Sequence, residues 1–185
     1  MDEDNHVPSL NRTPLHHAAL NDQTSTAELL LMNGAFIEAR DEDENTPLHL
    51  AIWKNHTDVA ELLLAKGALI QAENKYFNTS LHLAIWKGYT GMAQLLLRNG
   101  ALTEARNQDN HTPLHLAALR GHTSMVDLLL GKGASIEAFG ESNNTPLHLA
   151  THGVVIQEQW SCFSREVPQF KLGMKTQMLH CIMLH

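Results

Sequence analysis

The chain has 185 residues, a formal net charge of -7 and two cysteines. This length suits one elongated domain, and the acidic balance argues against nucleic-acid binding because phosphate backbones demand a basic footprint. No nucleophile and base converge at a recognised spacing, and no glycine-rich phosphate loop is visible. We therefore expect neither enzyme activity nor a cofactor.

The expected location in the cell follows from targeting and membrane-spanning segments that we do not find in the sequence. We find no signal peptide and no apolar run long enough to span a bilayer, and Cys162 and Cys181 form no disulfide framework. These features favour a reducing compartment. We expect a cytoplasmic protein, with a nuclear location as the other option, and no membrane insertion.

One four-residue string recurs along most of the chain. Its first residue falls every 33 positions, at Thr13, Thr46, Thr79, Thr112 and Thr145. Each copy reads Thr-Pro-Leu-His, except that Ser80 replaces proline once. A fixed period of this length indicates a solenoid, in which each unit buries its apolar face against its neighbours.

Each period predicts two helices. The threonine can accept a hydrogen bond from the first free amides of a helix, and a proline at the first helical position has no amide to leave unpaired. A second helix should follow, with caps at Thr24, Thr57, Thr90 and Thr123 and leucine triplets at 29–31, 62–64, 95–97 and 128–130. It should end at Gly34, Gly67, Gly100 and Gly133, because glycine tolerates the positive φ of a helix C-terminus.

The periodic pattern fails after about Ala150. The leucine triplet expected near 161–163 is absent, so the fifth copy is half a repeat. The predicted division is a repeat domain over residues 1–153, with copies starting near 11, 44, 77, 110 and 143, and an aperiodic tail over 154–185. A covering helix over 154–160 is one option for the start of that tail.

Two motifs in one register resemble the ankyrin repeat. They are the Thr-Pro-Leu-His string and a recurring Gly-Ala pair such as Gly34-Ala35, over roughly residues 5 to 150. The resemblance implies an all-α solenoid of stacked helix-turn-helix units with projecting β-hairpin loops. It also implies an intracellular scaffold or adaptor that binds a protein partner, and we expect it to be a monomer. One alternative is a regulatory segment of a larger channel, enzyme or signalling protein.

Thirteen histidines raise a second alternative, a metal-binding protein. The motif histidines are His16, His49, His82, His115 and His148. They lie one per repeat, about 10 Å apart at helix-packing distances, whereas zinc needs ligands about 2.0 to 2.1 Å from a common point. We therefore expect no metal site. Each ring should instead bond to backbone or to the threonine of its own or the next repeat.

The resemblance also implies which positions face a concave groove. At the loop tips these are Glu42, Asp43, Lys75, Tyr76, Gln108 and Asp109. On the first helices they are Trp53, Lys54, Trp86, Lys87, Leu119 and Arg120. The tryptophans either fill the junction between helix and loop or anchor a partner, and exposed aromatic residues favour the second interpretation. The acidic run at 41–44 is either a solvated tip or a site for a basic segment.

Two positions depart from the family pattern. Where the family prefers glycine, two residues before the threonine, Glu44 and Phe77 tolerate left-handed backbone poorly, which predicts strained loops. Four residues after the helix-ending glycine, where the family often has asparagine, stand Glu38, Gln71, Glu104 and Glu137. The side-chain hydroxylation known for ankyrin repeats is therefore not expected at these sites.

Overall fold

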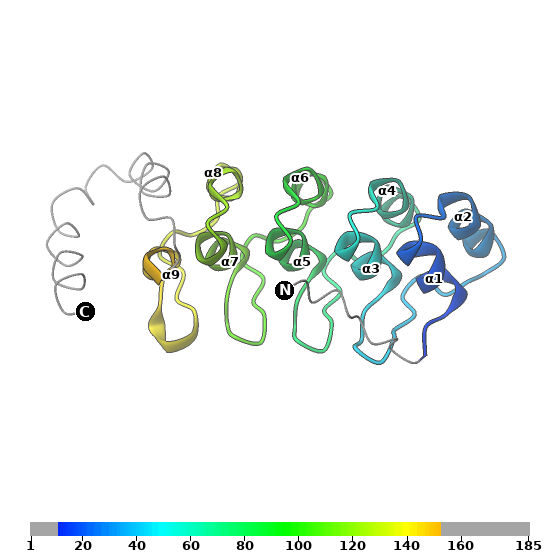
Figure 1. The fold of residues 1–185 in the computed structure, drawn as a ribbon, viewed down its shortest axis with the longest axis horizontal. Coiled ribbons are helices and arrows are strands. Elements are labelled where there is room, and N and C mark those ends of the chain that lie inside the picture. Colours follow the sequence, from blue (N-terminus) through cyan, green and yellow to red (C-terminus); the bar gives the residue numbers. More distant parts are fainter. Residues whose placement is uncertain (1–10, 153–185) are drawn as a thin grey trace, which may run out of the picture.

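The computed structural model describes residues 11–152, and these form four helix pairs followed by one further helix. The pairs stand side by side along the long axis, with first helices in one row, second helices in another, and long loops projecting from the row of first helices (Figure 1). The elements are α1 Pro14–Leu20, α2 Thr24–Met32, α3 Pro47–Trp53, α4 Thr57–Ala65, α5 Ser80–Trp86, α6 Thr90–Arg98, α7 Pro113–Arg120, α8 Thr123–Leu130, the 3-10 turn η1 Glu141–Asn143, and α9 Pro146–His152. The predicted all-α solenoid is confirmed.

The first helix of each pair begins where the sequence predicts. Thr13, Thr46, Thr79 and Thr112 are the N-cap residues, with extended backbone at ψ of 165 to 167°. Proline takes the first helical turn of α1, α3 and α7, where its missing amide leaves no bond unmade. The recurring string is therefore a helix start.

The predicted caps of the second helices are wrong by one residue. Each threonine is the first helical residue, and the cap is the residue before it, which makes no side-chain cap bond. The backbone turn explains the shift. His56 donates its amide to the Ala51 carbonyl of α3 at 2.9 Å, and its own carbonyl accepts the first bond of α4 from Ala60 at 3.1 Å. The residue before the threonine thus forms backbone hydrogen bonds with both helices.

The second helices end as predicted. Gly34, Gly67, Gly100 and Gly133 adopt φ of 84, 91, 90 and 83°. The alanine after each glycine donates its amide back into the helix, as Ala35 does to Leu30 at 2.9 Å. This pairing satisfies a carbonyl at the helix end and needs the left-handed glycine.

The loops project as expected but are not β-hairpins in the described part of the chain. They contain one isolated antiparallel bridge, between Glu73 and Thr79, and no strand. Each loop is closed by a backbone bond across its base, such as Asp41 N to Asn45 O at 3.1 Å. The tight turn, which has a left-handed residue at Glu44 (φ 56°) or Phe77 (φ 56°), leaves too few residues for a ladder.

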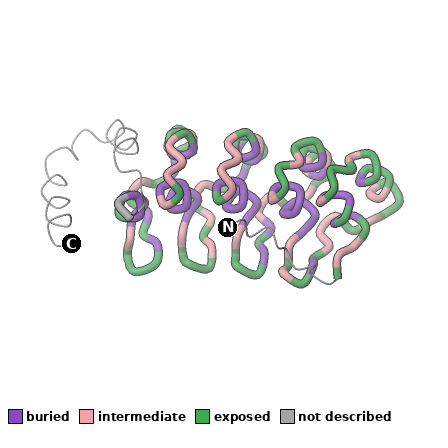
Figure 2. The backbone as a smooth tube through the Cα atoms, viewed as in Figure 1, coloured by how far each residue is buried: buried purple, intermediate pink, exposed green. Residues whose placement is uncertain are grey.

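The core lies between the rows of helices (Figure 2). The motif leucines Leu15, Leu48, Leu81 and Leu114 are at most 1% exposed. The middle leucine of each second helix is buried from α4 onward, whereas Leu30 of α2 is only half-buried and Leu29 is 61% exposed. The described part of the chain places a neighbouring second helix on only one side of α2. The weaker burial of α2 goes with its place at the first described repeat.

Residues 11–152 contain four complete helix pairs and the first helix of a fifth, which agrees with the predicted number of repeats. The boundary at 153, the tail over 154–185 with the covering helix considered for 154–160, and both cysteines lie outside the described residues. The division into repeat domain and tail stays a prediction.

Candidate functional site

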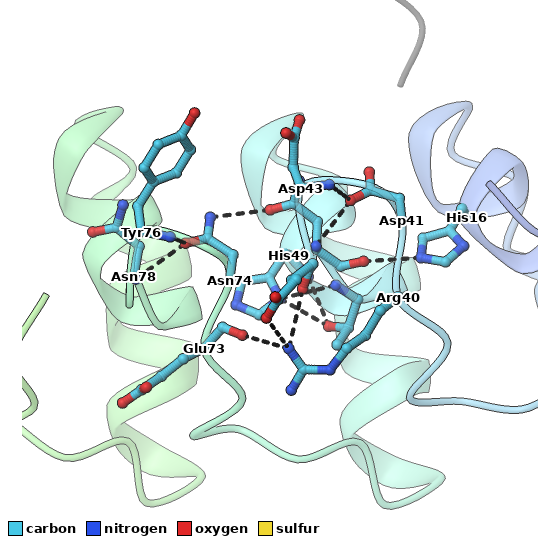
Figure 3. A network of polar contacts seen from close by, with 12 residues as sticks. His16, Arg40, Asp41, Asp43, His49, Glu73, Asn74, Tyr76 and Asn78 are labelled. Atoms are coloured by element: carbon cyan, nitrogen blue, oxygen red, sulfur yellow. Dashed lines mark hydrogen bonds and ion pairs between the residues drawn. The ribbon is translucent and has the colours of Figure 1, made fainter. Parts of the chain in front are cut away.

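The motif histidine joins each loop to the helix that follows and to the next loop. Nδ1 of His16 accepts the Thr13 amide at 3.0 Å and lies 2.9 Å from the Thr13 hydroxyl, which places the ring proton on Nε2. That Nε2–H donates to the backbone carbonyl of Asn45 in the next repeat at 3.0 Å (Figure 3). The predicted bonding of these rings is confirmed.

The same arrangement recurs along the stack. Nε2 of His82 lies 3.2 Å from the His111 carbonyl, and Nε2 of His115 lies 3.0 Å from the Asn144 carbonyl. His49 differs, because its Nε2 is buried without a hydrogen bond of ordinary geometry among the described residues. The rings of His16, His82 and His115 therefore each hold the next loop in place.

Burial favours the neutral form of the motif histidines His16, His49, His82 and His115. Loss of solvent lowers the pKa of His49 to about 4, against a smaller raising effect of the Asn78 carbonyl. Burial likewise lowers the pKa of His82 to about 4, and it lowers the pKa of His16 and His115. The described residues contain no group of three or more His, Cys, Asp or Glu side chains placed to hold a metal ion.

One side chain, at Asp41, Asn74 or Asn107, shapes the tip of each of three loops. Asp41 Oδ1 accepts the amides of Asp43 and Asn45 at 3.0 and 2.9 Å, and Asn74 Oδ1 accepts those of Tyr76 and Asn78 at 3.0 and 3.1 Å (Figure 3). A carboxylate or amide that accepts amides two and four residues ahead imposes a turn on the backbone. The tip residues are thus held in place before any partner arrives.

Neighbouring loops are bonded to one another. The Lys75 amide donates to the Asp43 carbonyl at 3.0 Å, and the Gln108 amide donates to the Tyr76 carbonyl at 2.9 Å. Asn74 Nδ2 donates to Asn45 Oδ1 at 3.1 Å. The row of tips therefore forms a continuous wall along the groove.

Arginine and glutamate side chains form further hydrogen bonds between neighbouring repeats, below the loop tips. Arg40 donates to the Glu73 carbonyl of the next loop at 2.8 Å, and Arg106 donates to the Phe139 carbonyl at 2.6 Å. Glu38 and Glu104 each accept an amide of the next repeat at 2.8 Å. These glutamates occupy the position where the family often has asparagine, and their side chains tie repeats together.

The acidic run at 41–44 proves largely structural. Asp41 is 4% exposed and pairs with Arg12 at 3.4 Å. Asp43 pairs with Lys75, and Glu44 lies 3.3 Å from Arg40. A solvated tip therefore describes this run incompletely, because the carboxylates of Asp41, Asp43 and Glu44 are engaged within the chain. Whether the run also meets a partner stays a prediction.

A groove of about 540 Å³ lies between the loop tips and the first helices of the second to fourth repeats. Its floor is apolar, and its wall on the loop side is polar. The lining residues are Asp43, Asn45, His49, Leu50, Trp53, Asn74, Tyr76, Asn78, His82, Leu83, Trp86, Asn107, Gln108, Asp109, His111, Leu116 and Leu119. This is the concave surface on which most of the predicted site residues meet.

The predicted residues divide into two groups. Trp53, Trp86, Leu119, Asp43, Tyr76, Gln108 and Asp109 line the groove. Lys54, Lys87, Arg120, Glu42 and Lys75 do not line it. Of the cations on the first helices, Lys87 and Arg120 each extend across to a tryptophan ring of the preceding repeat.

These cross-repeat contacts are cation–π pairs. Lys87 Nζ lies 3.9 Å from the ring centroid of Trp53, and the Arg120 guanidinium carbon lies 4.4 Å from that of Trp86. At exposed sites such a pair contributes about 0.5–1 kcal/mol. Lys75 lies 4.9 Å from the Tyr76 centroid at the loop wall. Each aromatic side chain that was singled out therefore has one face covered by a cation.

The two tryptophans are not equivalent. Trp53 is half-buried and packs against the core, which agrees with the interpretation that it fills the junction. Trp86 is 40% exposed, which leaves more of its surface available for contact. Their role as partner anchors stays a prediction.

Sequence reasoning missed part of the floor. Leu50, Leu83 and Leu116 line the groove although they are at most 7% exposed. They recur four residues after the threonine, a signal that was present but was absorbed into the expected core. Asn45, Asn78 and His111, one residue before each threonine, also line the groove, and the family resemblance implies this position as well.

Comparison with known families agrees with this architecture. A family model of ankyrin repeats in three copies matches residues 1–74, 41–107 and 81–157. The chain belongs to the ankyrin-repeat family, whose repeats serve as a general module for protein–protein interaction. No curated protein matches the chain closely enough to count as a relative. Within the described range, no helix combines the length and apolarity needed to cross a bilayer.

Proposed function

We propose that this chain is a protein-binding scaffold or adaptor that holds a segment of a partner along its concave groove and has no catalytic activity of its own. The observation that carries the proposal is the groove of about 540 Å³, with Trp53 and Trp86 on its floor and preformed loop tips on its wall. Exposed tryptophans in a concave surface are enriched among residues that dominate binding energy. The bonded tips lower the entropy that binding would otherwise cost.

The proposal also specifies how the groove is approached. The repeats act as a monomer, because the partner segment rather than a second copy covers the tryptophans. No nucleic acid is expected there, because the chain has a net charge of -7 and lacks the broad basic footprint that a phosphate backbone requires.

Substituting a floor tryptophan tests the proposal. Trp86→Ala should weaken retention of partner proteins from a cell extract by about 2 kcal/mol, roughly thirtyfold, while the melting temperature falls little because the side chain is 40% exposed. Trp53→Ala should weaken retention as well but lower the melting temperature more, since Trp53 packs on the core.

The matched control is Phe36→Ala, which removes an aromatic residue that is 71% exposed and does not line the groove. Quantitative mass spectrometry of retained proteins and thermal melting are measured for all three variants. A set of proteins lost with Trp86→Ala and kept with Phe36→Ala supports the groove. Equal retention by all variants would place the interface elsewhere.

A further inference from the structure

Three cations recur at the same place in successive repeats at the edge of the groove. Lys54 and Lys87 are the C-cap residues of α3 and α5, and Arg120 is the last residue of α7. Cations at helix C-termini are favoured by the helix dipole, which accounts for part of their placement. Among the described residues, however, none of the three makes an ion pair.

The unpaired state of these cations stands out because the chain is acidic. The net charge is -7, and the other cations near the loops are engaged: Lys75 by Asp43, Arg12 by Asp41 and Arg40 by Glu44. A row of uncompensated positive charge on one edge of a groove in an acidic protein produces a local field that attracts anions.

Two of the cations are also held in place. The ring of Trp53 lies against Lys87 and the ring of Trp86 lies against Arg120. A guanidinium stacked on a ring keeps its N–H edge available for a carboxylate, and restricting its rotamers beforehand lowers the cost of pairing. The ring faces that Lys87 and Arg120 cover are closed to a cation from a ligand. The positive charge at this edge therefore favours a partner that brings negative charge to it.

On this basis, which rests on the proposed function of the groove, we propose that the groove takes an extended acidic peptide. Its carboxylates pair with the edge cations Lys54, Lys87 and Arg120. Its apolar side chains lie on Trp86 and Leu119, and its opposite side can carry a cation facing Asp109 at the loop wall. Within the described part of the chain Asp109 also lacks an ion pair.

The repeat spacing sets the pattern of the peptide. Neighbouring helices pack about 8–10 Å apart, so the cations repeat at about this distance. A polyproline II segment rises about 3.1 Å per residue with three residues per turn, so every third side chain lies on one side about 9 Å apart. An extended segment with an acidic residue at every third position therefore matches the spacing of the cations.

A designed peptide tests this proposal directly. The probe is a fluorescein-labelled peptide of about twelve residues in which the triplet Glu-Leu-Pro repeats, so that glutamates form one row and leucines another. The charge-reversed control repeats Lys-Leu-Pro. We expect anisotropy titration to show that the acidic peptide binds the full chain at least about tenfold more tightly than the basic one, with affinity falling as salt rises.

Charge reversal in the protein supplies the second arm. Arg120→Glu and Lys54→Glu should each weaken binding of the acidic peptide about fivefold to tenfold. Lys54 contacts no aromatic ring that the structure records, so its reversal leaves the two cation–π pairs in place. The matched control is Lys132→Glu, which changes the net charge equally at an exposed residue that does not line the groove. Circular dichroism melting checks that each variant is folded.

The outcomes separate this inference from the function on which it rests. Equal affinity for both peptides, or equal weakening by Lys132→Glu, would overturn the acidic-peptide proposal. If cellular partners are lost with Trp86→Ala but kept with Arg120→Glu and Lys54→Glu, the groove function stands and its acidic specificity falls. Self-association in sedimentation that Trp86→Ala abolishes would make a second copy the occupant and would also overturn the proposal.

Discussion

At the scale of single residues, the motif histidine is the most consequential side chain. In His16, Nδ1 accepts a hydrogen bond from the backbone amide of Thr13. Its Nε2–H donates to the carbonyl of Asn45, the residue before the next motif threonine. A buried polar group with both nitrogens paired stabilises the neutral form. The residue that seemed a candidate metal ligand therefore links the repeats.

This neutral state predicts a pH dependence of stability. In the unfolded chain a histidine titrates near 6.5, whereas burial lowers the pKa of His82 and His49 to about 4. Between these values the unfolded chain binds more protons, so the free energy of unfolding falls as the pH falls through this window. Going from about pH 7 to about pH 5 should cost about 2 kcal/mol for each of the two groups.

Urea unfolding at both pH values measures this loss. His82→Ala should itself destabilise the protein by about 1–3 kcal/mol at neutral pH, and it should reduce the loss on acidification by about 2 kcal/mol. His17→Ala, at an exposed position in α1, is the control that leaves the acid loss unchanged. An identical acid loss in His82→Ala and the unsubstituted chain would contradict the assignment.

At the scale of elements, the loops are stiff despite having no strands in the described chain. Asx-type turns at Asp41 and Asn74 and amide bonds between tips replace a β-ladder. The strain predicted at Glu44 and Phe77 is present as positive φ, so the departure from glycine did not change the turn. The neighbouring bonds are sufficient to hold a costly backbone conformation.

Relief of this strain is measurable. Phe77→Gly should raise the free energy of unfolding by about 1 kcal/mol, because the left-handed conformation costs a bulky residue about 1–2 kcal/mol and glycine returns only part of that gain to the unfolded chain. The side chain is 52% exposed, so little packing is lost.

The matched control for the strained loop is Asn110→Gly, at the same repeat position with φ of 57°. Asparagine tolerates this conformation, so the change should be near zero or slightly destabilising. Chemical unfolding of both variants decides the matter. A loss of stability in Phe77→Gly as large as that in Asn110→Gly would show that its turn carries no strain.

At the scale of the whole molecule, stability should follow the number of neighbours that each repeat has. The helices α2 and α6 are both nine residues long, yet Leu29 of α2 is 61% exposed whereas the equivalent leucines of later repeats are half-buried, and Leu96 of α6 is fully buried. In a linear array the free energy of opening a repeat depends on its interfaces.

Hydrogen exchange tests this gradient. Amides of α4 and α6 should exchange more slowly than those of α2, because opening an interior repeat disrupts two interfaces. Mass spectrometry of peptides covering Leu62–Leu64, Leu95–Leu97 and Leu29–Leu31 gives the comparison. Equal protection in all three segments would mean that the array unfolds as one cooperative unit and not repeat by repeat.

The sequence by itself determined the repeat, its helix starts and its helix ends. Thr46, Pro47 and Gly67 act through local backbone chemistry, which needs no knowledge of distant residues. Patterns with local causes are therefore readable from the chain. The cap of the second helix was misplaced by one residue because it depends on a bond back into the first helix, from His56 to Ala51.

Only the tertiary structure decided how the repeats meet. The pairing of Lys87 with Trp53, of Asp43 with Lys75, and of Glu38 with the Leu69 amide crosses from one repeat to the next. A 33-residue period states that equivalent positions recur, but the offset between stacked repeats sets which position touches which. That offset is the sum of many packing contacts between helices. The period alone therefore does not show that Lys87 lies against Trp53, or Arg120 against Trp86, of the preceding repeat.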